Sequence, residues 1–499
     1  MNLGSARTGL AAALAVSLLL APLPATPQLP TLGDTSEMSS SAEQKMGEKI
    51  ARELFRDPDY IDDAIMSDYV QGIWQPLLDA ARARGELSAE LDERFAWQVL
   101  LGKDRSINAF ALPGGWLGMH MGLISVTTTR DELASVLAHE LSHVTQRHIS
   151  RLISKENRNA PLMIAAMILG ALVAGKSGDA GSAVIAGSQA LAIQNQLNFS
   201  REMEREADRV GYGVMTQAGF DPQGTVTMFD KLLQAARLND NGNFPYLRTH
   251  PMNTERIADM QSRQQLASRA QAAPPGLEHA MMAARARVIS NSSVDGLRGY
   301  LAEADAAPAG VAPARRAGLL YAAALASSKL RDNTAGARYM TQLRQAVEGD
   351  AAAARQARLL AGELALAAGD AQRAMSLADS QGAGRADLLL WSQAGIQAGM
   401  AGEVSQRLQT WVTRHPRDAT AWQVLSGAWT AQRQPLRAIR AQAEAQVAWL
   451  DYPAALDRFK AGQDLVRRGG PDIDHVEASI IDTRARQVQS LLREQALER

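Results

Sequence analysis

The sequence contains no cysteine among its 499 residues. This absence excludes disulfide bonds, thiolate metal ligands and lipid attachment through an N-terminal cysteine. An excess of either charge is also missing, because 52 basic and 53 acidic residues give a formal net charge of −1. The sequence has no basic cluster with interleaved aromatic residues either, so we expect no nucleic-acid partner.

Apolar runs long enough to cross a bilayer are also missing. The run near the N-terminus covers residues 10–21, follows Arg7 and precedes Leu23-Pro24-Ala25, where a small residue offers a cleavage point. This pattern predicts a secretory signal peptide over residues 1–25, with an uncleaved anchor as the alternative. A second run, residues 162–174, is also shorter than the about 20 residues of a membrane span. It can be interpreted as core, as a mobile cover, or as an element in peripheral contact with a membrane.

Histidine is scarce, with eight in the chain, yet two stand four residues apart in His139-Glu140-Leu141-Ser142-His143. Residues four apart lie on the same face of an α-helix. His139 and His143 can therefore present two imidazole nitrogens to one point, as a tetrahedral Zn²⁺ ion requires. Glu140 lies about 100° further round the helix, where it could act as a general base on a water molecule.

A helix is well marked around this motif. Thr129 and Glu132 form a capping box, and apolar residues then recur at helical spacing as far as Leu152. The sequence therefore predicts one continuous helix with the motif in its middle. On such a helix His148 points about 140° away from His143, so we expect it not to share a metal ion.

Catalytic zinc usually has three protein ligands, and the third is sought in the acidic stretch of residues 201–211. Glu204, Ala207, Asp208 and Gly211 share one helical face, whose small residues allow another helix to approach. This face predicts Glu204 as the third metal ligand, with Asp208 orienting a ligand histidine through its other N–H group. The opposite face looks solvated and carries Glu202, Arg205, Glu206 and Arg209. Taken alone, the stretch is also typical of an ordinary charged surface helix.

His250 precedes Pro251 and ends a predicted loop over residues 239–249. From this loop His250 could occupy the open metal position as a latch, or stabilise the oxyanion of the transition state. A plain surface turn is the third interpretation. We favour the latch slightly over the oxyanion role, and both roles place His250 among the candidate catalytic residues.

These residues resemble those of a known family. H-E-x-x-H followed by E-x-x-x-D, together with residues 108–115 and 248–251, resembles the gluzincin metallopeptidases of the CAAX-prenyl-protease type. The resemblance covers roughly residues 40–260 and implies an endopeptidase that uses one Zn²⁺ per chain. Residues 108–115 look like the strand before the active-site helix of that family, and we expect a strand over residues 107–112. An edge strand there could pair with an extended peptide substrate or could be simple sheet structure.

The remaining chain predicts a second, helical domain. We expect a linker over residues 26–40, a metallopeptidase domain over 41–265 and, after a Pro- and Ala-rich boundary, a repeat domain over 277–499. Trp422, Leu425, Ser426, Trp429 and Ala438 have spacings that resemble a tetratricopeptide repeat, with a generic α-solenoid as the alternative. The predicted fold is thus mainly α with a small β-sheet, a gluzincin metallopeptidase domain followed by a tetratricopeptide-like solenoid.

An export signal joined to repeats resembles the exported, repeat-bearing members of this family in Gram-negative bacteria. The resemblance implies a periplasmic protease that degrades misfolded or stalled outer-membrane proteins and assists their assembly. Its implied partners are those unfolded proteins and the outer-membrane assembly machinery, recruited by the concave face of the repeats. The alternative is a non-proteolytic chaperone or scaffold with structural zinc. Glu140 argues against it, since a structural site needs no general base.

Overall fold

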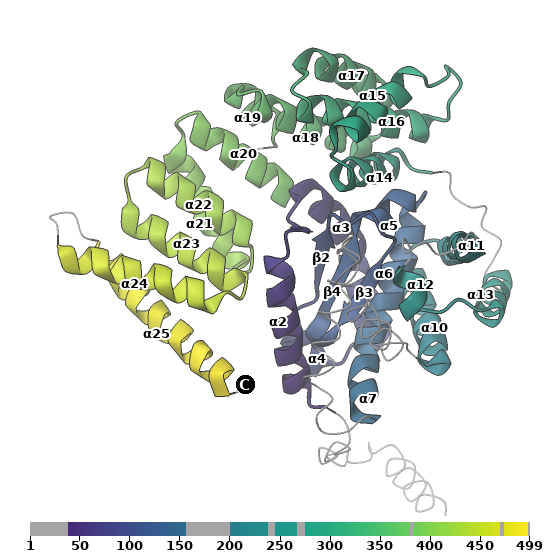
Figure 1. The fold of residues 1–499 in the computed structure, drawn as a ribbon, viewed down its shortest axis with the longest axis horizontal. Helices are drawn as coiled ribbons and strands as arrows, with labels where there is room; N and C mark the ends of the chain where they lie inside the picture. Colours follow the sequence, from purple (N-terminus) through teal and green to yellow (C-terminus); the bar gives the residue numbers. More distant parts are fainter. Residues whose placement is uncertain are drawn as a thin grey trace, which may run out of the picture.

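The computed structural model describes residues 38–155, 200–237, 245–266, 275–379, 384–469 and 474–497. These residues form many helices and a single small sheet (Figure 1), which confirms the prediction of a mainly α fold with a small β-sheet. The predicted signal peptide, most of the linker, the apolar run 162–174 and residues 239–244 of the predicted loop lie outside the described residues. Within the described residues, no helix is long and apolar enough to cross a bilayer.

A four-stranded sheet lies at the centre of the N-terminal part. Its strands are β1 (Tyr60–Ile61), β2 (Gln98–Gly102), β3 (Ala109–Leu112) and β4 (Trp116–His120), in the order β1-β2-β4-β3. β2 and β4 are parallel, whereas β3 and β4 are antiparallel. β3 is therefore an edge strand, formed within the stretch for which the sequence predicts one.

The chain reverses between β3 and β4 through two glycines with positive φ. Gly114 has φ of 72° and Gly115 has φ of 79°, a conformation that disfavours side chains. A Cβ atom at Gly115 would lie 2.8 Å from the Cβ atom of Phe95, so space also excludes a side chain there. This turn brings β4 back beside β3, and among the described residues no strand pairs with the other edge of β3, which faces the site described below.

The helix that carries the histidine motif is shorter than predicted. α6 (Arg130–Thr145) starts at Thr129, whose hydroxyl accepts a hydrogen bond from the Glu132 N–H at 3.2 Å. Arg147 then has φ of 54°, and the separate helix α7 (His148–Lys155) follows. The prediction of one continuous helix as far as Leu152 is therefore wrong. His143 lies in the last turn of α6, and the motif is not in the middle of the helix.

Helices on both sides of the N-terminal sheet complete this part of the structure. They are α2 (Ser40–Arg56), α3 (Ala64–Ala83), α4 (Ala89–Arg94), α5 (Met121–Val126), α10 (Arg201–Gln217), α11 (Gln223–Arg237), α12 (Pro245–Thr249) and α13 (Thr254–Leu266). α10 packs against α6. A Cβ atom at Gly211 would lie only 3.1 Å from the carbonyl carbon of Ala138, so the small face of α10 permits this close contact. α12 forms where the sequence predicts the end of a loop.

Helical hairpins make up the C-terminal part and curve around one side of the N-terminal part (Figure 1). The helices are α14 (Leu277–Ser290), α15 (Val294–Asp305), α16 (Pro313–Lys329), α17 (Asn333–Ala346), α18 (Ala351–Ala367), α19 (Ala371–Leu377), α20 (Arg385–Gln397), α21 (Ala401–Arg414), α22 (Ala419–Ala431), α23 (Pro435–Ala448), α24 (Tyr452–Arg468) and α25 (His475–Leu497). In the hairpin α22–α23, the Ser426 hydroxyl donates to the Ala438 carbonyl at 3.0 Å. The arrangement is consistent with a helical solenoid, while the tetratricopeptide assignment stays a prediction.

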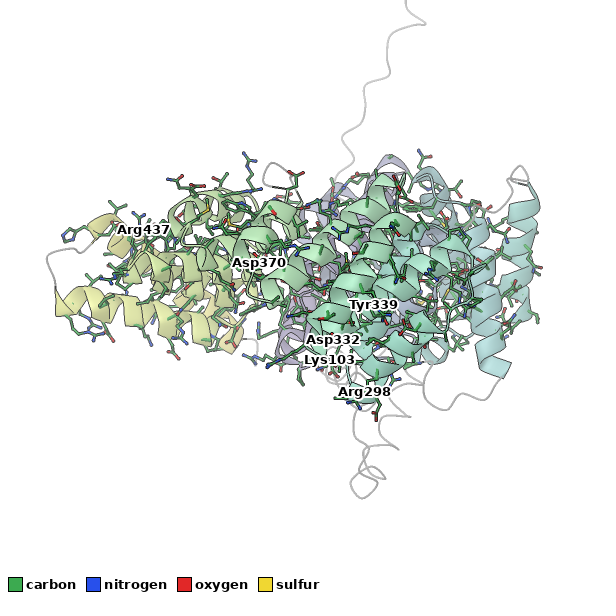
Figure 2. The ribbon with its side chains drawn as sticks, turned by 90° about the horizontal axis from the view of Figure 1, so that it is seen from above. Lys103, Arg298, Asp332, Tyr339, Asp370 and Arg437 are labelled. Atoms are coloured by element: carbon green, nitrogen blue, oxygen red, sulfur yellow. The ribbon has the colours of Figure 1, made fainter. Side chains whose placement is uncertain are left out.

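Polar side chains extend along the whole length of this helical part. Figure 2 shows them from Arg298 and Asp332, in the earlier helices, to Arg437 in the later ones. Asp332 caps α17 by accepting from the Ala335 N–H at 2.9 Å, and Arg437 lies 3.0 Å from Asp474. These contacts are typical of solvated outer faces of stacked helices.

Three arginines join the two parts of the chain. Each one pairs with an acid at or near the start of α3 and with a second acid of the helical part. We call them the arginine bridges: Asp62–Arg385–Asp418, Asp63–Arg285–Glu363 and Asp68–Arg355–Asp387. One cluster of buried apolar side chains also runs through both parts. The predicted domain division between residues 265 and 277 therefore stays a proposal.

Candidate metal centre

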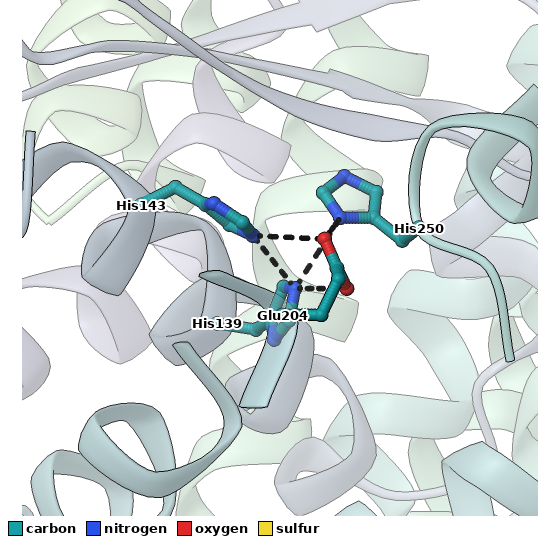
Figure 3. A group of neighbouring side chains, drawn as sticks. All are labelled: His139, His143, Glu204 and His250. Carbon is teal, nitrogen blue, oxygen red and sulfur yellow. Dashed lines mark hydrogen bonds and ion pairs between the residues drawn. The ribbon is translucent and has the colours of Figure 1, made fainter. Parts of the chain in front are cut away.

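Four buried side chains meet between α6, α10 and the residue after α12. His139, His143, Glu204 and His250 each offer one ligating atom, and these atoms lie within 4.8 Å of one another (Figure 3). The Nε2 atoms of His139 and His143 are 3.0 Å apart. Oε2 of Glu204 lies 3.5 Å from Nε2 of His139, and Oε1 of Glu204 lies 3.5 Å from Nε2 of His143. The structure thus brings together the side chains that the sequence predicts as ligands.

The outer nitrogen of His139 is held by Asp208. The Nδ1 atom of His139 lies 3.0 Å from Oδ1 of Asp208, one turn after Glu204 on α10. A carboxylate accepts hydrogen bonds, so Nδ1 carries a proton and Nε2 is the nitrogen that faces the cluster. Asp208 therefore lies where the sequence predicts a residue that orients a ligand histidine.

The outer nitrogen of His143 is held by His148, which the sequence analysis did not predict. Their Nδ1 atoms are 2.9 Å apart, and Nε2 of His148 lies 3.1 Å from Oε2 of Glu206. The expectation that His148 points away from His143 assumed a continuous helix, and the break at Arg147 removes that assumption. His148 does not belong to the group of four, but it contacts one of its members.

Glu206 also differs from its predicted place on a solvated face. Its side chain is only partly exposed, and its Oε2 accepts from Arg151 at 2.8 Å as well as from His148. The other three residues of that face, Glu202, Arg205 and Arg209, are exposed as predicted. The solvated face of α10 is thus interrupted where α7 packs beside it.

The donor atoms of this cluster fit a metal cation. The two Nε2 atoms and the Glu204 carboxylate converge, and such a group is repulsive unless a positive charge lies between its members. Burial alone lowers the pKa of His139, but hydrogen bonds to Asp208 and Glu204 raise this pKa to about 10. Burial holds the pKa of His143 well below 6.5. The site therefore attracts a cation, either a proton or a metal ion, while one imidazole stays neutral and able to coordinate.

Glu140 lies beside the cluster, and only one of its two carboxylate oxygens has a hydrogen bond among the described residues. Its Oε2 accepts a hydrogen bond from the Ala111 N–H of β3 at 2.8 Å. Its Oε1 is buried, has no hydrogen-bond partner among the described residues, and lies 3.5 Å from Nε2 of His250. A fully buried carboxylate oxygen without a partner is costly and points to a role in chemistry.

His250 follows α12 and is only 1% exposed. Its Nδ1 lies 3.0 Å from Oε1 of Glu204 and 3.3 Å from Nε2 of His139. The backbone N–H group of His250 donates to the Tyr246 carbonyl at 2.9 Å. The Tyr246 ring stacks on the His250 ring, with centroids 4.6 Å apart. The interpretation of His250 as a surface turn residue is therefore wrong, because the ring is buried among the candidate ligands.

Arg256 is a further residue that the sequence analysis missed. Its guanidinium binds both oxygens of Asp208 at 2.6 and 2.8 Å. It also lies 2.7 Å from Oε2 of Glu204 and donates to the Pro251 carbonyl at 2.9 Å. Arg256 thus joins the helix that carries Glu204 to the segment that carries His250. An arginine on α13 has no periodicity or motif that would identify this role.

Comparison with known proteins agrees with this geometry. Residues 74–264 match the model of Peptidase family M48. This part of the chain is a family M48 peptidase domain. The match includes all four side chains of the cluster as well as Glu140, Asp208 and Arg256. The prediction of a metallopeptidase is confirmed for this domain. The acids Asp62, Asp63 and Asp68 of the arginine bridges lie just before the matched residues.

Relatives of the M48 domain occur in bacteria and mitochondria. The chain is 34% identical over 237 residues to the β-barrel assembly-enhancing protease of Escherichia coli K12, a match that covers 47% of each chain. It is 33% identical over 238 residues to a putative β-barrel assembly-enhancing protease of Vibrio cholerae, again covering 47% of each. It is 28% identical over 207 residues to the mitochondrial metalloendopeptidase OMA1 of Saccharomyces cerevisiae, covering 39% of this chain and 55% of the relative. The chain spans about half the length of the curated relatives it matches.

Proposed function

We propose that this protein is a zinc endopeptidase in which His139, His143 and Glu204 hold one Zn²⁺ ion. The observation that carries the proposal is the pair of Nε2 atoms facing one carboxylate, with a second carboxylate, Glu140, partly unpaired beside them. Two imidazoles and a glutamate are a known ligand set of catalytic zinc in proteases. When bound, zinc supplies Lewis acidity toward a peptide carbonyl and toward water.

Glu140 is the general base of the proposed reaction. Its Oε2 is anchored on the Ala111 N–H, which leaves Oε1 directed toward the cluster. Oε1 takes a proton from the attacking water and gives it to the leaving amine. Asp208 keeps His139 in the tautomer that can coordinate metal, since its carboxylate accepts the outer N–H.

The open edge of β3 offers a place for the substrate backbone. Backbone groups of successive strand residues point to opposite sides, and the Ala111 N–H points to Glu140 and not to β4. Ala109 therefore also faces the open edge, and its N–H and C=O groups can pair with an extended peptide. Such pairing would hold a peptide beside Glu140 without reading its side chains.

The role of His250 has two versions with opposite outcomes. The proximity of its Nδ1 to Glu204 and His139 favours a latch that occupies the remaining metal position. In that case His250→Ala should raise basal proteolysis, including self-cleavage, while zinc is retained. If His250 instead stabilises the oxyanion, the same variant should retain zinc and lose nearly all activity. Unchanged activity would rule out both versions.

Substrate and location are inferred from the relatives. Two of them are named β-barrel assembly-enhancing proteases, which supports a place in the bacterial periplasm and action on misfolded or stalled outer-membrane proteins. We propose that the helical part recruits these proteins and the outer-membrane assembly machinery. The curvature of its helical hairpins around the M48 domain supports this role (Figure 1).

One observation favours a second candidate, a chaperone or scaffold with structural zinc. With His250 included, the cluster offers four protein donors, and structural zinc sites are closed in this way. The two candidates differ at Glu140, which a structural site would not need.

Replacing Glu140 with glutamine separates the candidates. The amide oxygen of the new side chain can still accept from the Ala111 N–H, so the fold should persist, but the amide cannot take a proton from water. We expect zinc content to be retained and cleavage of an unfolded outer-membrane β-barrel protein to be lost. The exposed Glu202→Gln on α10 is the matched control and should cleave normally. Unchanged cleavage by Glu140→Gln would refute the proposal that this protein is a zinc endopeptidase.

A further inference from the structure

We propose that His148 is a positioning residue that fixes the orientation and tautomer of His143, and so raises the affinity of the M48 domain for its metal ion. The inference rests on the proposed metal site. It assigns a role to a histidine outside the group of four ligating side chains. Three observations carry it: the pattern of hydrogen bonds, the helix break that creates the contact, and the burial of both rings.

The hydrogen bonds can run in only one direction. The ionised carboxylate of Glu206 can only accept, so the proton of a neutral His148 is on Nε2, which donates to Glu206 at 3.1 Å. Nδ1 of His148 then has only a lone pair and must accept from the Nδ1–H group of His143, 2.9 Å away. The proton of His143 is therefore on Nδ1, and its Nε2 is left to face Glu204 and His139. Each hydrogen bond therefore fixes the tautomer of the next residue, and the series of hydrogen bonds ends on the carboxylate of Glu206.

Glu206, the last residue of this series of hydrogen bonds, is itself held in place. Oε2 of Glu206 accepts from Arg151 at 2.8 Å, so the carboxylate stays ionised and available to His148. Arg151 lies one turn after His148 on α7. Residues of two helices, α7 and α10, thus hold the outer side of one metal ligand of α6.

The contact depends on the break between α6 and α7. Arg147 adopts φ of 54°, which turns the next residue back toward the end of α6. Its guanidinium donates to Glu43 of α2 at 3.0 Å and to Ser150 at 3.2 Å. A non-glycine residue with positive φ costs free energy and persists only where its surroundings hold it. Here the bond to Glu43 of α2 and the bond to Ser150 of α7 hold it, and the result is the placement of His148.

Because both rings are buried, the loss of the hydrogen bond between His143 and His148 would have a cost. His143 and His148 are both 0% exposed, and their ring centroids are 4.9 Å apart at 75°. If the acceptor on His148 were removed, solvent would not easily replace it, and the buried N–H of His143 would lose a partner. The His143 ring could then rotate or exchange tautomers, and either change would move its lone pair away from the metal.

The two ligand histidines are held by unlike partners. His139 donates to the carboxylate of Asp208, whereas His143 donates to a neutral imidazole. A carboxylate raises ligand basicity more than a neutral acceptor does. Loss of the hydrogen-bond partner of a metal ligand weakens metal binding by about 10–100-fold. We expect the loss of His148 to lie at the lower end of this range, at about 10-fold.

The test compares two substitutions of His148 in the full-length chain. His148→Leu fills similar space but accepts no hydrogen bond. In His148→Asn, the side-chain oxygen can take the place of Nδ1 and accept from His143. Zinc affinity is measured for both by competition with a chromophoric chelator. Circular dichroism and thermal unfolding in the presence of a chelator report on the fold of each variant without metal.

We expect His148→Leu to raise the zinc dissociation constant about 10-fold. His148→Asn should restore the affinity to within about threefold of the original chain, because the lost acceptor is replaced. The exposed His475→Leu is the matched control and should bind zinc normally.

Two results would overturn the inference. One is unchanged zinc affinity in His148→Leu. The other is equal weakening in both His148 variants, since this would indicate a packing role and not an acceptor role. Failure of the unmodified chain to bind zinc would instead refute the proposed function, and the two failures are therefore distinguishable.

Discussion

A close contact between the two ligand-bearing helices, at Gly211, can be tested with a single methyl group. A Cβ atom at Gly211 of α10 would lie 3.1 Å from the carbonyl carbon and oxygen of Ala138, and 3.2 Å from the His139 nitrogen. These are backbone atoms of α6, so no side chain can turn aside to make room. In Gly211→Ala the two helices must separate by a few tenths of an ångström, at the level of His139 itself.

Two opposing effects determine the size of the change. Alanine is favoured over glycine inside a helix by about 1 kcal/mol. Overpacking a buried contact costs about 1–3 kcal/mol. We therefore expect Gly211→Ala to lower the free energy of unfolding of the zinc-free protein by about 0–2 kcal/mol. Zinc affinity should fall as well, because Glu204 lies on the helix that must move.

The neighbouring Gly213 supplies the control. The three atoms nearest to a Cβ atom there belong to the guanidinium end of Arg84, a flexible side chain that is partly exposed. Gly213→Ala should therefore keep the gain in helix propensity and stabilise the protein by about 0.5–1 kcal/mol. Thermal unfolding with a chelator and zinc competition would be measured for both variants. If Gly211→Ala stabilised the protein as much as Gly213→Ala and bound zinc equally well, our reasoning about this contact would be wrong.

Two further predictions concern charged groups. Asp208→Asn should weaken zinc binding by about 10–100-fold, measured by chelator competition, because the partner of His139 loses its charge; an unchanged affinity would contradict this. Burial raises the pKa of Asp418, but the hydrogen bonds and charge of Arg385 outweigh burial and lower it below 3.8. A carboxyl whose folded-state pKa is lowered stabilises the protein fully above its unfolded pKa of about 4, and loses this contribution as the pH falls through the folded value. The arginine bridge at Asp418 should therefore be insensitive to pH between about 5 and 8 and weaken below about pH 4, which thermal unfolding at each pH would detect as a loss of stability that is smaller in Asp418→Asn.

The shared face of His139 and His143 on one helix, and that of Glu204 and Asp208 on another, could be predicted from the sequence because helical spacing is a local property. Each pair of positions one turn apart shares a face whatever the rest of the chain does. The small residues beside Glu204 added a second local signal, and the close approach at Gly211 agrees with it. The metal-binding roles of these residues nevertheless stay predictions until zinc is measured.

Features that depend on distant contacts could not be predicted in this way. The end of α6 follows from the strained backbone of Arg147, which α2 holds through Glu43. Apolar spacing alone continues smoothly past this point, so His148 was expected on the wrong face. Arg256 is buried because acids of another helix surround it, and nothing in its own segment shows this.

The open edge of β3 has a consequence for the choice of client proteins. In a completed β-barrel every strand is paired on both sides, so none has backbone groups left to offer to Ala109 and its neighbours. A barrel whose closure has stalled still carries an unpaired strand. Under the proposed function, β3 would therefore bind only client proteins that still have an unpaired strand. The longer a strand stays unpaired, the more probable cleavage becomes relative to completed assembly.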